Sequence, residues 1–277
     1  MNRKPCAARS GGLPVTIEQI MAEQPKILVV DDEAVITGAA EKILRAEGFR
    51  VRGTADAEMA LTMFRVDPPD IALVDLMLPG LSGLELLNIV RREYPQTVVI
   101  MMTGYSMLDN AIVFLKCGAF DFIPKPFTFE EMLSAVQRAG RFIALRAADR
   151  RVGSEAASPH RYQLGISSWA KADQDGTALL GITNLFGQLV GRISRVELPS
   201  VNDEVRQGGP LAQVVAQDEM RHTAWSALSG RIIAVNHFAQ EIREPPNGDP
   251  LGDSWLVRII PDNLESEMMN LSIERSR

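Results

Sequence analysis

The sequence predicts two domains: an α/β domain built on a doubly wound, five-stranded parallel sheet, and a second domain that is mostly β. In the first half, short β-branched apolar segments alternate with segments of helical periodicity. In the second half, short strand-like segments follow one another through turns that contain glycine. The 277 residues are enough for one large domain or two smaller ones, so the length allows this division.

The expected strands of the first domain are apolar and bounded by polar or turn residues, as buried parallel strands are. They read KILVV from Lys26, IALVD to Asp75, TVVIMMT to Thr103 and DFIPK to Lys125, with RVRGT at 50–54 as an edge strand. Helices are expected between them at 34–47, 57–66, 83–94 and 108–116. A last helix follows Thr128, which forms a capping box with Glu131, and runs towards Arg146.

The second half has a different pattern of apolar and turn-forming residues. Strands are expected in TALLGIT, RISRVELP, PLAQVVA, GRIIAVN and SWLVRII, with a helix at 184–190 and a last helix from about Asn263. VVAQDEMRHTAW at 214–225 is typical of a hairpin with a charged tip. The expected organisation is a flexible leader at 1–24, the α/β domain at 25–146, a linker at 147–163 and the β domain at 164–277.

Charge and composition exclude some classes of protein. Residues 164–277 carry 10 basic and 15 acidic side chains, nearly all of the net charge of −6. An acidic domain repels phosphate backbones, so we expect no DNA binding through this half. No apolar run is long enough to span a bilayer. Two cysteines and the lack of a secretory signal pattern indicate a cytoplasmic protein.

Polar side chains stand at the ends of the expected strands of the first domain. Asp31 and Asp32 follow the first strand, and Asp75, Thr103 and Lys125 end three others. The carboxyl ends of parallel strands share one crevice, so these groups should meet. Three carboxylates that close together require a cation, and hard oxygen ligands suit Mg²⁺. Each residue alone has an ordinary structural explanation, but their joint placement favours a site.

Four strings in residues 26–146 resemble the receiver domain of two-component response regulators. They are LVVDDE, LVDLMLPGLSGLELL, MMTGYS and GAFDFIPKPF, and they cover the whole domain. The resemblance implies a flavodoxin-like fold and a cis peptide bond between Lys125 and Pro126. It also implies that Asp75 accepts a phosphoryl group from a sensor histidine kinase or a phosphotransfer protein.

The same resemblance implies the remaining roles. Asp32 would bind Mg²⁺, with Asp31 beside it as a ligand or an orienting group, and Asp75 and the main-chain carbonyl of Met77 would complete the protein ligands. Thr103 and Lys125 would contact the phosphoryl group and act as its catalytic partners. Thr103 and Phe122 would form the conformational switch, although core packing explains Phe122 equally well.

Residues 162–268 resemble the H protein of the glycine cleavage system, a lipoyl-carrier β fold of the barrel-sandwich type. The matching strings are YQLGISSW, DGTALLGITNLFGQLVGRISRVELPSVNDEVRQGGPL, SGRIIAVN and DPLGDSWLVRI. In that family a lysine at a hairpin tip carries lipoate, and here its place falls on Glu219. No lysine follows Lys171, and a carboxylate cannot form the amide bond, so no lipoate is expected.

Together these patterns predict a response regulator that uses Mg²⁺, whose output comes from protein contacts of an unlipoylated H-protein-like domain. It would be no enzyme beyond catalysing its own phosphotransfer and dephosphorylation. The alternatives are a phosphate sink and a metabolic regulator derived from a lipoate carrier. The output partner stays open, and a homodimer through the receiver is compatible with the sequence. Glu219, Met220 and Arg221 at the hairpin tip are candidate partner contacts, unless the tip is a relic.

The missing lysine gives a direct test. Expression of the chain with lipoate and a lipoate ligase should add no lipoyl group, because the second half offers no amine side chain after Lys171. Intact-mass spectrometry measures this. A lipoyl adduct would overturn the interpretation of the second domain.

Overall fold

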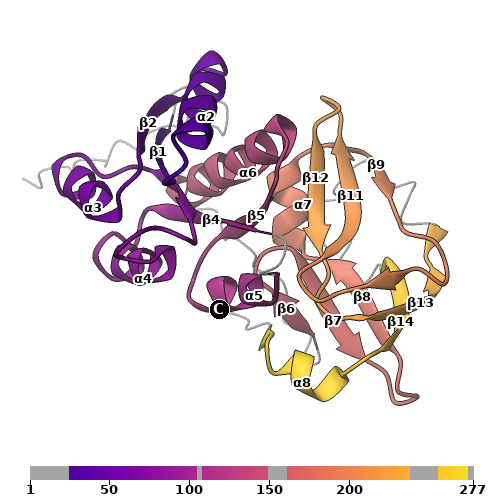
Figure 1. Cartoon of the computed structure of the whole chain (residues 1–277). Helices are drawn as coiled ribbons and strands as arrows, with labels where there is room; N and C mark the ends of the chain where they lie inside the picture. Colours follow the sequence, from indigo (N-terminus) through magenta and orange to yellow (C-terminus); the bar gives the residue numbers. More distant parts are fainter. Residues whose placement is uncertain (1–24, 105–107, 149–160, 238–254, 274–277) are drawn as a thin grey trace, which may run out of the picture.

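The structure is a computed structural model that describes residues 25–104, 108–148, 161–237 and 255–273 (Figure 1). The expected leader at 1–24 lies outside the described residues. So do residues 149–160, which make up most of the expected linker. In the part of the chain that is described, no helix is long and apolar enough to cross a membrane.

The first domain has the predicted α/β architecture. Five parallel strands pair in the order β2-β1-β3-β4-β5, and a helix follows each of them. The elements are β1 (Lys26–Val30), α2 (Ala34–Ala46), β2 (Arg50–Thr54), α3 (Ala57–Val66), β3 (Ile71–Asp75), α4 (Gly83–Glu93), β4 (Val98–Gly104), α5 (Leu108–Lys116), β5 (Asp121–Lys125) and α6 (Phe129–Ala147).

Alternation along the strands divides the apolar core between the two faces of this sheet. Leu28 and Val30 of β1 pack in the layer that contains buried residues of α3, α4 and α5. Ile27 and Val29 pack in the opposite layer, with buried residues of α2 and α6. Helix α6 begins at the predicted capping box, in which Thr128 accepts a hydrogen bond from the main chain of Glu131.

The second domain contains a seven-stranded sheet, ordered β10-β13-β14-β8-β7-β6-β15, and a three-stranded sheet, ordered β12-β11-β9. Its elements are β6 (Tyr162–Leu164), β7 (Ser168–Ala172), β8 (Ala178–Ile182), α7 (Asn184–Val190), β9 (Ile193–Glu197), β10 (Glu204–Val205), β11 (Pro210–Ala216), β12 (Arg221–Trp225), β13 (Gly230–Val235), β14 (Val257–Pro261), α8 (Leu264–Met268) and β15 (Ser272–Ile273).

Most of the strands expected in the second domain are present, and α7 has the predicted bounds. The sequence did not predict β6, β7, β10 and β15. Strand β6 begins at Tyr162, inside the segment that the sequence assigned to the linker. Strands β10 and β15 have two residues each, too few for alternation to be visible, and β7 contains only two consecutive apolar residues before the exposed Lys171.

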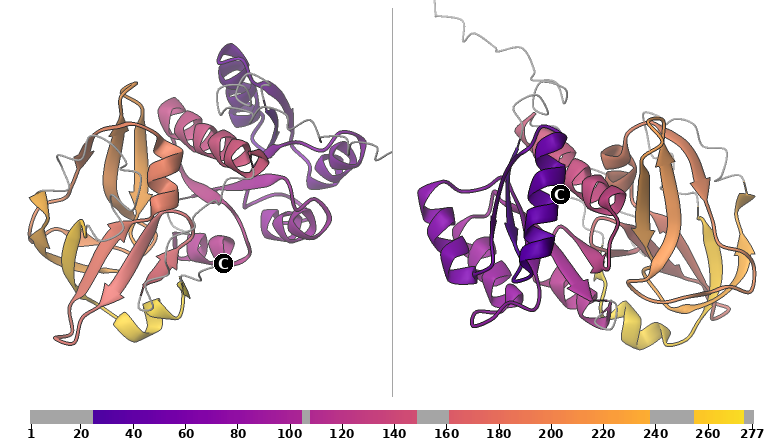
Figure 2. Two further views of the ribbon diagram at one scale, coloured as in Figure 1. Left: turned by 180° about the vertical axis from the view of Figure 1, so that it is seen from behind. Right: turned by 45° about the horizontal axis from the view of Figure 1, so that its top comes forward.

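The two domains pack against each other through α6, β5 and α5 of the first. Helix α6 lies beside β12 and α7 of the second domain, which is visible from opposite sides in Figures 1 and 2. Both apolar layers of the first domain continue across the boundary. The layer that contains Phe122 also contains the core of the second domain, and the layer of α6 also contains Leu189 of α7. The second domain is therefore part of the same packed structure.

A buried polar network crosses this boundary. Asp121 of β5 forms an ion pair of 2.6 Å with Arg138 of α6. Arg138 also lies 3.0 Å from Nδ1 of His222, and the indole Nε1 of Trp225 donates to Asp121 at 3.0 Å. A guanidinium only donates, so Nδ1 of His222 is the acceptor and its proton is on Nε2. All four side chains are buried.

The buried imidazole predicts a pH dependence of stability. Burial first, and then the positive charges of Arg138 and Arg141, lower the pKa of His222 to about 3. At pH values between about 3 and the ordinary pKa of about 6.5, His222 is protonated in the unfolded chain but neutral in the folded protein. Lowering the pH from 7 to 5 should therefore reduce the free energy of unfolding by about 2 kcal/mol through this group.

Urea unfolding of the protein and of His222→Asn at both pH values checks this. The asparagine can still accept from Arg138 but has no proton to take up. The loss of stability on acidification should therefore be about 2 kcal/mol smaller in the variant. Equal losses in the two proteins would mean that the imidazole does not stay neutral in the folded state.

Candidate functional site

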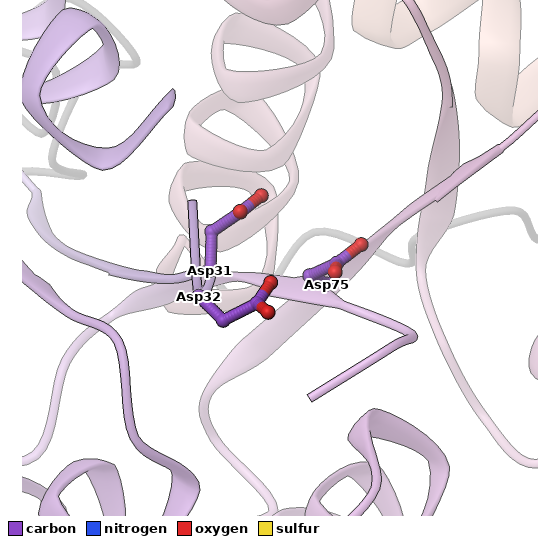
Figure 3. A group of neighbouring side chains, drawn as sticks. All are labelled: Asp31, Asp32 and Asp75. Carbon is purple, nitrogen blue, oxygen red and sulfur yellow. The ribbon is translucent and has the colours of Figure 1, made fainter. Parts of the chain in front are cut away.

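The expected site residues lie at the ends of four strands, along one edge of the parallel sheet. Asp31 directly follows β1, Asp75 is the last residue of β3, and Thr103 and Lys125 lie at the ends of β4 and β5. Ligand oxygens of Asp31, Asp32 and Asp75 lie within 4.8 Å of one another, and Figure 3 shows the three side chains together. The carboxylates therefore meet as the strand order predicted.

Lys125 places its ammonium among these carboxylates. Its Nζ lies 2.7 Å from Oδ2 of Asp31, 3.1 Å from Oδ1 of Asp75 and 3.4 Å from Glu33. The contact with Asp31 is an ion pair to a fully buried carboxylate. The Lys125–Pro126 peptide bond is cis, as the sequence predicted.

Burial sets the electrostatics of the site. Desolvation raises the pKa of Asp31 above its ordinary value, and the contacts with Lys125 and with the main-chain N–H of Glu33 offset this only in part. Desolvation acts to lower the pKa of Lys125, but the interactions with Asp31 and Asp75 outweigh it and raise that pKa. The lysine is therefore held as a cation beside carboxylates that repel one another.

The Thr103 side chain is buried next to the site. The residue is fully buried, and its Oγ1 has no hydrogen-bond partner among the described residues. A buried hydroxyl usually has one, because leaving it unsatisfied costs about 1–3 kcal/mol. Thr103 lies near the end of β4, the strand next to the one that Asp75 ends, so it stands at the same edge of the sheet.

The donor set fits a hard divalent cation. Three carboxylates supply oxygen atoms at one point, and Asp32 is exposed, which leaves room for the water ligands that Mg²⁺ retains. Met77 lies two residues beyond Asp75, with its side chain 62% exposed, in the loop before α4. The residues present are therefore compatible with the expected magnesium site.

The start of α4 packs closely against the main chain of Asp75. Ser82 caps the helix and forms a capping box with Glu85. Gly83 donates its N–H to the carbonyl of Leu76, and a Cβ atom on Gly83 would lie 2.0 Å from the main-chain oxygen of Asp75. Only glycine can occupy this position while the chain after β3 keeps its path.

Phe122, the expected switch residue, is buried and stacks on Trp225 of the second domain. The ring centroids are 4.5 Å apart and the planes are 25° from parallel. The sequence left both core packing and a switch open for Phe122. In the structure the Phe122 ring packs against the second domain, and Trp225 is its stacking partner.

The hairpin tip makes its polar contacts inside its own domain. Glu219 has a positive φ of 64° and pairs with Arg195, while Arg221 pairs with Glu197. Met220 is half-buried against the apolar layer of α6. The apolar part of the expected partner contact is thus directed at the first domain of the same chain, and only the charged part faces solvent.

Sequence reasoning missed Asp121, Arg138 and His222. One signal was available: Arg138 stands among apolar positions of α6, between Val136 and Ala139, where an unpaired charge would be costly. That signal predicts a buried partner but does not identify it. The partners lie 17 and 84 residues away along the chain.

Comparisons with known families agree with this arrangement. The family model described as the response regulator receiver domain matches residues 27–137. The model described as the glycine cleavage H-protein matches residues 160–276.

Curated relatives are regulatory proteins. The nitrogen assimilation regulatory protein NtrX of Azorhizobium caulinodans is 38% identical over 218 residues, which are 77% of this chain and 43% of that protein. The transcriptional regulatory protein CseB of Streptomyces avermitilis is 28% identical over 90% of this chain and 93% of its own. The chain thus spans less than half the length of the NtrX relative.

Among solved structures, the receiver domain of NtrX from Brucella abortus is 36% identical. The match covers 41% of this chain and 96% of that one, with a TM-score of 0.40.

The close approach at Gly83 predicts a matched pair of substitutions. Gly83→Ala should lower the free energy of unfolding by about 3 kcal/mol, because the new methyl group forces the chain after Asp75 to move. Gly38→Ala, in an open position of helix α2, should instead raise it by about 0.5–1 kcal/mol. Urea unfolding measures both. A Gly83→Ala protein as stable as the parent would show that this loop adapts freely.

Proposed function

We propose that this chain, in which a receiver domain matching residues 27–137 is followed by a glycine cleavage H-protein domain matching residues 160–276, is a response regulator that accepts a phosphoryl group on Asp75. The donor is a phosphohistidine of a sensor kinase or a phosphotransfer protein. The observation that carries the proposal is the cluster of three carboxylates with the Lys125 ammonium 3.1 Å from Asp75, at the sheet edge where the buried Thr103 hydroxyl has no hydrogen-bond partner among the described residues.

The reaction is a displacement at phosphorus. A carboxylate oxygen of Asp75 forms the new P–O bond, the P–N bond of the donor breaks, and the electron pair leaves with the imidazole. The carboxylate is a weak nucleophile, but the transition state is loose, so positioning and charge neutralisation supply most of the catalysis. Lys125, 3.1 Å from Asp75, lies within reach of one phosphoryl oxygen, and Thr103 donates to another.

The carboxylates would hold the cofactor. Asp31, Asp32 and Asp75, with the carbonyl of Met77, would bind Mg²⁺, and the ion would neutralise negative charge on the phosphoryl oxygens. Glu33 donates its N–H to Oδ1 of Asp31 and so orients that carboxylate. We assign no other catalysis to the chain: it would transfer the phosphoryl group to itself and hydrolyse its own acyl phosphate.

The output would be protein contact by the H-protein domain without lipoate, in the cytoplasm. The acidic charge of residues 164–277 disfavours DNA as the target. A phosphate sink would need no communication between domains, so the shared apolar layers and the buried network favour a signalling role over this alternative. The β5–α6 face is covered by the second domain, so a homodimer of this form would have to use another face.

Phosphorylation of Asp75 is tested by labelling. Acetyl phosphate with Mg²⁺ should place an acid-labile phosphoryl group on the protein, and Asp75→Asn should abolish it because the shape stays while the nucleophile is lost. The matched control is Asp70→Asn, which removes a carboxylate just before the other end of β3. This variant should be labelled like the parent. Labelling of Asp75→Asn, or labelling that a chelator leaves unchanged, contradicts the proposal.

A further inference from the structure

A groove lies at the amino ends of β1 and β2, beside the end of α2, and it has a volume of about 380 Å³. Small-molecule sites commonly have volumes of about 300–1,000 Å³. Strand β1 has five residues, so the groove and the carboxylate cluster lie at opposite ends of it, roughly 15 Å apart. In Figure 1 β2 lies at the side of the sheet away from the second domain, which therefore leaves the groove open.

The groove concentrates positive charge on an acidic protein. Among the described residues that line it, four are cations and one, Asp67, is a carboxylate. The chain as a whole has a net charge of −6, so general basicity does not explain this excess. Such an excess attracts anionic ligands, and arginines favour phosphate because a planar guanidinium pairs with two oxygens at once. The cations are Lys26, Arg45, Arg50 and Arg52.

Asp67 orients two of these cations without neutralising the groove. Its carboxylate lies 2.6 Å from Nζ of Lys26 and 3.3 Å from a guanidinium nitrogen of Arg52. The hydrogen bond from Lys26 first, and then the neighbouring positive charges, hold the pKa of Asp67 below its ordinary value. Arg50 is among those charges, so it acts on the same carboxylate. The two fixed cations are therefore oriented before any ligand arrives.

Arg45 closes the free side of β2 to an added strand. The carbonyl of Thr54 accepts from Asp31 on the β1 side, so by alternation the carbonyl of Val51 points to the free side. Arg45 donates twice to this carbonyl, at 3.1 and 2.7 Å, and it also pairs with Glu41 of its own helix. A peptide that extended the sheet would need the same carbonyl. The groove therefore suits a compact ligand better than an extended acidic segment of another protein.

Phe49 gives the groove an aromatic wall. The residue is half-buried, lines the groove and packs against the apolar layer that contains α2 and α6. Aromatic side chains stack on nucleobases of any sequence, because every base has a flat face. An aromatic wall beside guanidinium groups therefore matches a ligand that has both a planar ring and phosphate.

We propose that this groove binds a small ligand that carries phosphate groups and a planar ring, such as a nucleoside diphosphate. The phosphates lie among the arginine side chains, and the ring contacts Phe49. The site is separate from Asp75 and needs no Mg²⁺, because cations of the chain itself balance the charge of the ligand. It would give the chain a small-molecule input in addition to phosphorylation.

Calorimetric titration with ADP in buffer without Mg²⁺ tests the site. One ADP should bind per chain with a dissociation constant below about 1 mM at low salt. Arg50→Gln should weaken binding about fivefold or more, because it removes a charged donor from the groove. The matched control is Arg92→Gln, which removes the same charge from an exposed position of α4 and should bind ADP like the parent.

A second variant tests the ring contact. Phe49→Leu keeps an apolar side chain but removes the aromatic face, so ADP should bind about threefold or more weakly while the affinity for pyrophosphate stays the same. Nuclear magnetic resonance locates the ligand. ADP should shift the amide signals of β2 and leave those of Asp31 and Asp75 in place, and Asp75→Asn should bind ADP like the parent.

The other results would overturn the proposal. Without saturable binding below about 1 mM, or with equal affinities of Arg50→Gln and Arg92→Gln, the groove is no ligand site. Pyrophosphate that binds as tightly as ADP would refute the ring contact and with it the proposed ligand. A polyglutamate peptide that binds more tightly than ADP and shifts the same amides would assign the groove to acidic protein segments. Labelling of Asp75 by acetyl phosphate is a separate measurement, so the phosphoacceptor role stands or falls independently.

Discussion

The carboxylate of Asp121 joins three parts of the molecule. It accepts from the main-chain N–H of Phe122 on its own strand, from Arg138 on α6 and from the indole of Trp225 on the second domain. Removing one partner of such a buried ion pair costs about 3–5 kcal/mol, because the other charge stays buried without compensation. The position of the β domain on the receiver therefore depends strongly on this side chain, three positions before Pro124 in the strand that also carries Lys125.

The receiver domain could be predicted from the sequence almost to the residue. Its strands are short and, apart from the edge strand β2, mostly buried and apolar, and the residues at their ends follow from the rule that parallel strands share one edge. Asp75 and Lys125 were therefore placed in one site without any structure. The path of the chain after Asp75 could not be predicted in the same way, because the need for glycine at position 83 arises from a 2.0 Å approach that only the folded backbone defines.

The second domain and its docking were less predictable. Its shortest strands have two residues and carry no periodic signal. The contacts of Trp225 and His222 with the receiver join residues about a hundred positions apart, and no local pattern specifies which surface a buried aromatic ring will meet. The charged tip could be recognised in the sequence. Its charges pair with residues of a neighbouring strand, and this pairing depends on the register of β9 against β11. Sequence patterns describe elements well, whereas contacts between domains arise from the whole fold.

The continuous apolar layers have a consequence for how such a protein can evolve. Two domains joined only by a linker can be exchanged for others, because neither contributes to the interior of its partner. Here Phe122 and Leu189 belong to interiors that both domains share. If either domain were replaced by a related one, its side chains would no longer fit the interior of the other domain, and the misfit would resemble that of a core mutation. Exchange of either domain would therefore require compensating changes in the interior of the other.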